Sequence, residues 1–138
     1  MSKEFIYTGQ DNLKSMQLAI NYNVFLLSLV TKHIKSKKAK ILDFGSGIGT
    51  HCTALKKQGY TNVDCLEIDK HQARELETKG FRVYQSINQL VDADYDLIYS
   101  FDVFEHIADD KAIYAQLFSK LKKGGKIITY VPAFQVLF

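Results

Sequence analysis

The first residues that could bind a ligand form a glycine-rich turn, DFGSGIG, at positions 43–49. Glycine lets a backbone turn sharply and approach a bound group without a Cβ in the way, and a following helix directs free N–H groups at it. The dinucleotide fingerprint G-x-G-x-x-G would need glycine where this chain has Thr50, so the spacing disfavours pyrophosphate. The Asp43 carboxylate suits an ammonium group instead. Taken alone, the turn is equally consistent with a tight connection.

A carboxylate that could hold a sugar ends the next apolar run, at Glu67, about twenty residues beyond the glycines. In an open α/β sheet, an acid at this place accepts hydrogen bonds from both hydroxyls of a ribose. Ile68 would then flank an adenine ring, and Asp69 is interpreted as a helix cap. The alternative is that Glu67 is a solvent-facing acid at a strand end. Ser86 and Asn88 offer a hydroxyl and an amide to a base edge at the end of the third apolar run.

Hydrophobic periodicity predicts the elements that position these residues. An amphipathic helix is expected from about Asn12 to Lys35, capped by Asp11, because apolar residues recur at three- and four-residue steps: Leu13, Met16, Ile20, Val24, Leu27, Val30 and Ile34. Strands are predicted at 41–44, 63–68, 82–85, 96–101 and 126–131, helices at 50–58, 70–79 and 110–122, and a half-turn at 87–90. Gly59, Gly80 and the pair Gly124-Gly125 are expected to end helices, and Pro132 to end the last strand.

Strands that alternate with helices at this spacing predict parallel βαβ units with right-handed crossovers. We therefore expect an α/β fold, an open sheet of five parallel strands with helices on both faces and a preceding N-terminal helix. In such sheets ligands bind beyond the carboxyl ends of the strands, which is where the residues above lie.

Length and composition predict a single globular domain over residues 1–138, with a helical segment at 1–38 and the Rossmann-like core at 39–138. Hydrophobic residues make up 46% of the chain and charged residues 24%, which excludes disordered, collagen-like and coiled-coil classes. The net charge of +3 disfavours nucleic acid as a partner. The lysines at 32, 35, 37, 38 and 40 are interpreted as a solvated helix end, with phosphate binding as the alternative.

Cysteine usage and the N-terminal sequence predict the compartment. Cys52 and Cys65 form no C-x-x-C pair, so neither a disulfide framework nor a structural zinc site is expected, and reduced thiols fit the cytoplasm. The first residues lack the apolar core of a signal peptide, and no apolar run approaches the roughly 20 residues that cross a bilayer.

Four segments in order, from Ile41 to Val131, resemble class I S-adenosylmethionine-dependent methyltransferases of the small-molecule group that includes ubiquinone-biosynthesis O-methyltransferases. They are ILDFGSGIGTH, CLEID, YDLIYSFDVFEHI and KKGGKIITYVPAF. The resemblance implies a Rossmann-like sheet with strand order 3-2-1-4-5, S-adenosylmethionine as cofactor and a small-molecule acceptor.

The resemblance also implies roles for single residues. The methionyl end of the cofactor would be surrounded by Asp43, Gly45, Ser46, Gly47 and Gly49. Glu67 would hold the ribose, Ile68 and Ile87 would sandwich the adenine, and Phe101 would line the sulfonium. Tyr22, on the leading helix, would cover the cofactor or be a core tyrosine.

In such an enzyme the acceptor attacks an already activated methyl group, so the protein mainly aligns the reactants. His106 is the candidate base, beside Glu105 just past the fourth strand. The alternatives are a helix start in which His106 is merely exposed, and a metal-binding Glu-His pair, for which no further ligands are identified. Asp102 would meet substrate or cap the turn. The histidines at 33, 51 and 71 are treated as surface or packing residues.

The given sequence departs from the family pattern in one respect, because members continue past the fifth strand through a sixth and a seventh, and it stops at Phe138. We therefore expect a cofactor-binding core that is either naturally short or truncated. The fifth strand is then an exposed apolar edge, which predicts a homodimer through that edge or low solubility. Three functions stay open at this point: a methyltransferase, a binding module that holds the cofactor without transferring a methyl group, and a nicotinamide-dependent oxidoreductase.

Overall fold

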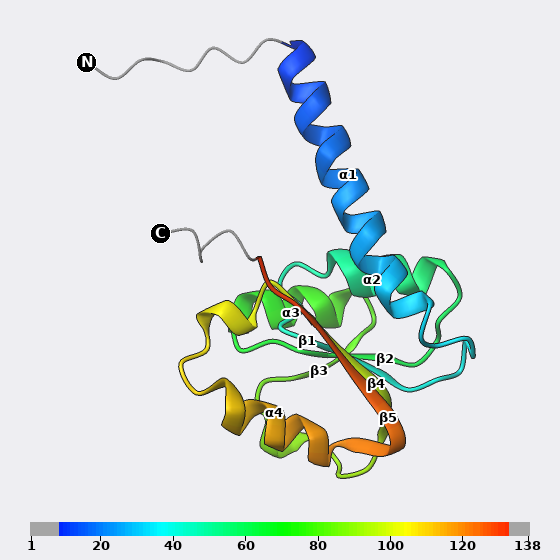
Figure 1. Ribbon diagram of the computed structural model, residues 1–138, viewed down its shortest axis with the longest axis vertical. Coiled ribbons are helices and arrows are strands. Elements are labelled where there is room, and N and C mark those ends of the chain that lie inside the picture. Colours follow the sequence, from blue (N-terminus) through cyan, green and yellow to red (C-terminus); the bar gives the residue numbers. More distant parts are fainter. Residues whose placement is uncertain (1–8, 133–138) are drawn as a thin grey trace.

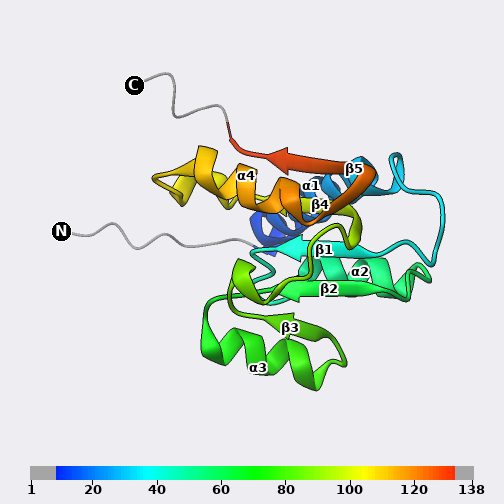
Figure 2. The ribbon, with the colours of Figure 1, turned by 90° about the horizontal axis from the view of Figure 1, so that it is seen from below.

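The sheet has five parallel strands in the order β3-β2-β1-β4-β5, which confirms the predicted topology. In the computed structural model, which describes residues 9–132 and the side chains of residues 14–132, the arrows of β5, β1, β2 and β3 point the same way (Figure 2). Residues 1–8 and 133–138 of the predicted domain lie outside this range. The strands are β1 (Ile41–Phe44), β2 (Val63–Leu66), β3 (Arg82–Tyr84), β4 (Tyr95–Phe101) and β5 (Leu121–Tyr130).

Helices cover both faces of this sheet, as predicted. They are α1 (Gly9–Thr31), α2 (Thr50–Lys57), α3 (Lys70–Thr78) and α4 (Asp110–Ser119), with single 3₁₀ turns η1 (Ile87–Gln89) and η2 (Phe104–His106). One buried cluster lies between the sheet and α1, α2 and α3, and the other lies under α4 and the two 3₁₀ turns. Ile41 belongs to the first cluster and Leu42 to the second, because successive side chains of a strand point to opposite faces.

The predicted start of one helix and the predicted ends of two helices are confirmed. The Asp69 side chain caps α3 by accepting a hydrogen bond of 2.8 Å from the Gln72 N–H. Gly59 and Gly80 follow α2 and α3 with φ angles of +96° and +93°, the left-handed conformation that ends a helix.

The bounds of the N-terminal helix differ from the prediction, and its apolar residues are buried over only part of its length. The helix begins at Gly9, so Asp11 does not cap it, and it ends at Thr31, before Lys35. Its C-terminal turns bury Leu26, Leu27 and Val30, whereas Met16, Ile20 and Val24 are exposed. Figure 1 shows the reason, since the blue N-terminal part of α1 extends beyond the sheet, where nothing in residues 9–132 packs against it. Within those residues, no helix combines the length and apolarity needed to cross a bilayer.

The boundary between α4 and β5 also differs from the prediction. The helix ends at Ser119 instead of Lys122, and β5 begins at Leu121 instead of Lys126. Tyr95 of β4 pairs with Leu121, but Leu97 pairs with Lys126, so β5 carries extra residues at an irregularity in the pairing. Gly124, at φ +80°, lies in this irregularity, and the glycine pair therefore kinks a strand where it was expected to end a helix.

Candidate functional site

The glycine turn between β1 and α2 needs glycine for two reasons, conformation and space. Gly45, Gly47 and Gly49 have φ angles of +79°, +58° and +87°. A Cβ at Gly45 would lie 2.5 Å from Val103 Cγ2, and one at Gly49 would lie 2.6 Å from Leu76 Cδ2, whereas at Gly47 it would meet nothing within 4 Å. The turn is thus packed at both ends and open in the middle.

Glu67 joins the end of β2 to this turn. Its Oε1 accepts a hydrogen bond of 2.7 Å from the Gly47 N–H, and its Oε2 accepts one of 2.9 Å from the Asp69 N–H. The residue is only 8% exposed. Carboxylate oxygens have about four lone-pair sites in all, so both can still accept bonds from ligand hydroxyls. The turn and the acid therefore converge on one place, as the sequence predicted.

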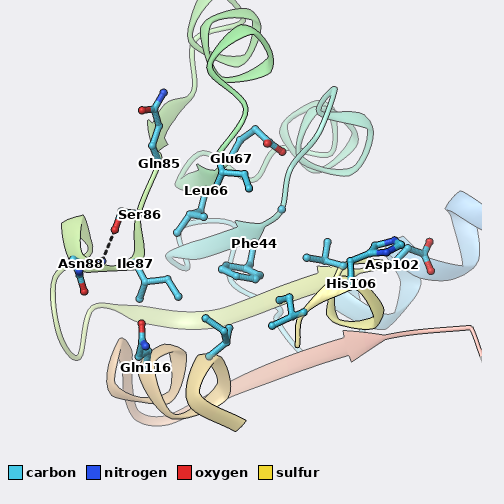
Figure 3. A pocket seen from close by; sticks show the side chains of 15 residues that line it. Phe44, Leu66, Glu67, Gln85, Ser86, Ile87, Asn88, Asp102, His106 and Gln116 are labelled. Carbon is cyan, nitrogen blue, oxygen red and sulfur yellow. Dashed lines mark hydrogen bonds between the residues drawn. The ribbon is translucent and has the colours of Figure 1, made fainter. Parts of the chain in front are cut away.

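A cavity of about 590 Å³ opens beside this contact, within the usual size range of small-molecule sites. Its walls are Phe44, Gly45, Leu66, Glu67, Ile68, Gln85, Ser86, Ile87, Asn88, Asp102, Val103, His106, Ile107, Ile113 and Gln116. In Figure 3, Ser86, Ile87 and Asn88 lie at one end, Asp102 and His106 at the other, and Phe44 between them. In the described part of the chain no lysine or arginine lines the cavity, so its fixed charges are carboxylates.

Asp102 forms the rim of the cavity next to α1. The Tyr22 hydroxyl donates a hydrogen bond of 2.7 Å to Asp102 Oδ2, and the Asp102 N–H donates one of 2.9 Å to the Tyr130 carbonyl oxygen. Burial and the bond to Asp102 raise the pKa of Tyr22 well above its usual value, so its hydroxyl stays protonated and donates. Asp102 Oδ1 is buried and has no hydrogen-bond partner among residues 9–132.

His106 lies in η2, between the cavity and solvent. Its side chain is 76% exposed, and its Nε2 lies 3.3 Å from Glu105 Oε1. The carboxylate and the imidazole thus form the pair that the sequence suggested. No group of three or more His, Cys, Asp or Glu side chains within residues 9–132 could hold a metal ion.

Comparison with known proteins identifies the family. A family model described as "Methyltransferase domain" matches residues 18–135. The chain belongs to this family. It is 36% identical over 97 residues to the ubiquinone biosynthesis O-methyltransferase of Idiomarina loihiensis, a match that covers 64% of this chain and 40% of that protein. It is 28% identical over 98 residues to phosphoethanolamine N-methyltransferase 2 of Caenorhabditis elegans, covering 64% of this chain and 22% of that protein. The chain therefore spans less than half the length of these curated relatives.

Solved structures of methyltransferases share the fold. A crystal structure of coclaurine N-methyltransferase, bound to N-methylheliamine and SAH, superposes with a TM-score of 0.65 at 19% identity. The superposition covers 77% of this methyltransferase domain and 35% of that chain. The Rossmann-like fold class expected from the sequence is confirmed.

The predicted cofactor residues of the methyltransferase domain fall into two groups. Four of them, Gly45, Glu67, Ile68 and Ile87, line the cavity. The other five, Asp43, Ser46, Gly47, Gly49 and Phe101, do not form its wall. Their contacts with a cofactor stay predictions.

Asp43 and Ser46 support the glycine turn from behind. The Tyr99 hydroxyl donates a hydrogen bond of 2.7 Å to Asp43 Oδ2, and the Ser46 hydroxyl donates one of 2.9 Å to the Asp43 carbonyl oxygen. Burial raises the pKa of Asp43 to about 7, although the bond from Tyr99 acts in the opposite direction. These two hydrogen bonds hold the backbone that leads into the turn.

Phe101 faces the buried cluster on the α1 and α2 side of the sheet, and its ring packs 5.1 Å from the His51 ring. The sequence treated His51 as a surface or packing residue. The structure places it near Asp102, with a pKa that burial lowers and an Nε2 that has no partner in the described residues. His51 lies in the first turn of α2, directly after the glycines, and the N-terminus of a helix often faces a ligand. This position was the sequence signal that could have indicated His51 as a site residue.

Proposed function

We propose that this methyltransferase domain binds S-adenosylmethionine in the cavity and transfers its methyl group to a small-molecule acceptor. The hydrogen bond between Glu67 and the Gly47 N–H is the observation that carries the proposal, because it joins the turn and the ribose acid at the wall of one cavity. The family match and the fold neighbours support it.

The cavity fits this cofactor in shape and charge. A ribose at Glu67 directs an adenine toward Ile68 and Ile87 and leaves the opposite end, at Asp102, for the cationic methionyl part. Carboxylates without neighbouring lysine or arginine suit a sulfonium and an ammonium group. When bound, the cofactor supplies a methyl group that is already activated, so the chain needs no nucleophile of its own.

The side chains of the domain then bind and orient the reactants, and one of them receives a proton. Glu67 and the turn fix the cofactor, which sets the direction of methyl transfer. The proposed base is His106, whose imidazole reaches both cavity and solvent and can pass the acceptor's proton to water. The acceptor is a small molecule with a hydroxyl, amine or carbon nucleophile.

A second candidate is a domain that binds the cofactor without transferring a methyl group. The family match leaves the oxidoreductase hypothesis without support.

Calorimetric titration with S-adenosylmethionine and S-adenosylhomocysteine tests binding, with NADH as the control ligand. We expect saturable one-site binding of the first two and none of NADH. A protein that is folded by circular dichroism but binds neither adenosyl ligand contradicts the proposal. Transfer of a labelled methyl group across a panel of small acceptors then separates the two candidates, since the binding module would label none.

We also propose a cytoplasmic location and a homodimer through the free edge of β5. Cys52 and Cys65 are both free and buried, which suits a reducing compartment. β5 is an outer strand of the sheet and its last residues are only half-buried, so it offers unpaired backbone groups to a second copy.

A further inference from the structure

We propose that the basic end of the domain binds the surface of a membrane that contains anionic phospholipids. The basic end is a set of six exposed lysines in the connection from α1 to β1 and at the end of α2: Lys32, Lys35, Lys37, Lys38, Lys56 and Lys57. Both connections lead into strands, so they lie at the amino ends of the sheet, and the arrowheads in Figure 2 point away from them. The cavity opens at the carboxyl ends, and the inference is therefore independent of the proposed function.

Positive charge is concentrated in this part of the chain. Residues 32–61 contain seven lysines and one acid, the buried Asp43, whereas the other residues include 11 basic and 14 acidic ones. The two connections are held together, since the Thr61 N–H donates a hydrogen bond of 3.1 Å to the Lys37 carbonyl oxygen and the Tyr60 hydroxyl donates one of 3.0 Å to the Ile34 carbonyl oxygen. The small net charge of +3 therefore combines a strongly basic region with an acidic remainder.

The six lysines of the basic end form no ion pair within the described part of the chain. Other lysines at the amino ends of the strands do, in the pairs Lys40–Asp94, Lys120–Asp92 and Lys122–Asp96. Gathered like charges repel one another, and they attract a partner of opposite charge over a long range. A surface that carries many negative charges is the partner that relieves this repulsion.

A helix dipole accounts for only half of these lysines. Lys56 and Lys57 are in the last turn of α2, and Lys32 directly follows α1, so these three face the negative end of a dipole. The other three lie four or more residues beyond Thr31, where α1 ends, and the effect of a dipole falls off within the last turn. The expectation of a solvated helix end does not explain them, which favours the alternative, phosphate binding.

Lipid headgroups fit this surface better than the bases of a nucleic acid do. Lys37 Nζ lies 4.1 Å from the centre of the Tyr60 ring, and Lys56 Nζ lies 5.0 Å from that of Phe81. Both rings are buried, so neither is free to stack on a base. Residues 32–61 also contain no arginine, the side chain that most often reads a base edge. The lysines are point charges that can contact phosphates of any arrangement.

Two exposed apolar side chains at the same end of the sheet also favour a membrane. Phe118, in the last turn of α4, is 71% exposed, and Val91, in the connection that leads into β4, is 64% exposed. The Ala93 N–H donates a hydrogen bond of 3.0 Å to the Ser119 carbonyl oxygen, which joins these two segments. Apolar side chains gain free energy in the interfacial region of a bilayer while lysines stay at the headgroups. The phosphates of a nucleic acid offer them no such environment.

Cosedimentation with lipid vesicles tests the inference. The vesicles are pure phosphatidylcholine or a two-to-one mixture of phosphatidylcholine and phosphatidylserine, at physiological and at high salt. The test variant is Lys35→Gln/Lys38→Gln. Its matched control is Lys70→Gln/Lys111→Gln, which removes two exposed charges from the first turns of α3 and α4, at the carboxyl ends of the strands. A labelled DNA duplex, titrated at the same salt, is the competing polyanion.

We expect the wild type to bind the mixed vesicles at physiological salt, to bind them less at high salt, and not to bind pure phosphatidylcholine. Each lysine near an anionic membrane changes the partition coefficient about fivefold, so the test variant should bind at least about tenfold more weakly. The control variant should change less than about threefold. Circular dichroism verifies that both variants are folded.

Four results overturn the inference. They are no binding of the wild type to the mixed vesicles at physiological salt, equal binding to both kinds of vesicle, equal losses in the test and control variants, and tighter binding to the DNA duplex than to the mixed vesicles. If a variant does not fold, the wild-type comparison of the two vesicles and the duplex still decides. A protein that binds the mixed vesicles but not S-adenosylhomocysteine refutes the proposed function and leaves this inference standing.

Discussion

Glu67→Gln tests the site directly, because it keeps the shape of the side chain and removes its charge and one hydrogen-bond acceptor. In the native chain Oε1 accepts from the Gly47 N–H at 2.7 Å and Oε2 accepts from the Asp69 N–H at 2.9 Å. The amide oxygen of glutamine replaces one acceptor, but its NH₂ group must face the other N–H. One charge-assisted bond is lost, and the other becomes a weaker, neutral bond.

The size of the effect follows from these contacts. A hydrogen bond to a charged group contributes about 1.5–3 kcal/mol, and a buried donor without a partner costs about 1–3 kcal/mol. Since Glu67 is only 8% exposed, water from the cavity replaces the lost acceptor only in part. We expect the free energy of unfolding to fall by about 2–4 kcal/mol. The affinity for S-adenosylhomocysteine should fall a further tenfold or more, because the ribose hydroxyls lose a charged acceptor.

Urea unfolding followed by circular dichroism measures the first effect, and calorimetry at a temperature where both proteins are folded measures the second. Glu75→Gln, on the exposed surface of α3, is the control for loss of one negative charge and should stay within about 0.5 kcal/mol of the wild type. A Glu67→Gln protein as stable as this control refutes the hydrogen-bond argument. Unchanged affinity for S-adenosylhomocysteine refutes the ribose assignment.

Three further predictions concern the turn, its buried acid and the sheet edge. In urea unfolding, Gly45→Ala should destabilise the fold by more than Gly59→Ala. Both glycines have positive φ angles, but a Cβ at Gly45 would lie 2.5 Å from a valine methyl carbon, while one at Gly59 would meet nothing within 4 Å. Equal losses of stability would show that only backbone strain matters. Burial raises the pKa of Asp43 to about 7, whereas the pKa of an aspartate in the unfolded chain is about 3.9. The folded protein therefore loses stability as pH rises from about 4 through 7, because the buried carboxyl must ionise. The free energy of unfolding of Asp43→Asn minus that of the wild type should therefore rise by up to about 4 kcal/mol between pH 4 and pH 8. If this difference does not change with pH, the prediction is wrong. Sedimentation velocity at tens of micromolar should show a dimer or larger species formed through β5, and a monodisperse monomer would count against the free-edge argument.

Much of the site was predictable because its signals are local. The glycine spacing after an apolar run fixes a strand, a turn and a helix in order, and the parallel βαβ rule then brings the ends of β1 and β2 together. This is why the sequence places Gly47 and Glu67 at one crevice with Ile68 beside it, whereas Ile87 was expected there from the family resemblance. The carboxylate and imidazole of 105–106 were predictable for the same reason, since they are adjacent in the chain.

The direction of single side chains was not predictable in the same way. β4 is buried on both faces, so its residues lack the alternation of polar and apolar types that shows which face each side chain takes. The side chain of Phe101, for example, packs on the α1 and α2 side, and the cavity wall after β4 comes from Asp102 and Val103. The expected contact of Phe101 with the sulfonium stays a prediction. The role of Gly124-Gly125 was not predictable either, because a kink in a strand and the end of a helix both favour glycine.

Apart from the boundary between α4 and β5, the sequence by itself determined which segments form strands and helices. It also determined the meeting of the turn with Glu67, since this follows from neighbouring residues and from the right-handed crossover between parallel strands. Tertiary structure alone decided which residues of α1 are buried and that Tyr22 bonds Asp102. The physical reason is that helical periodicity shows which residues share a face but not what packs against it. A hydrogen bond between residues 80 positions apart depends on the path of the whole chain between them, which no local sequence pattern determines.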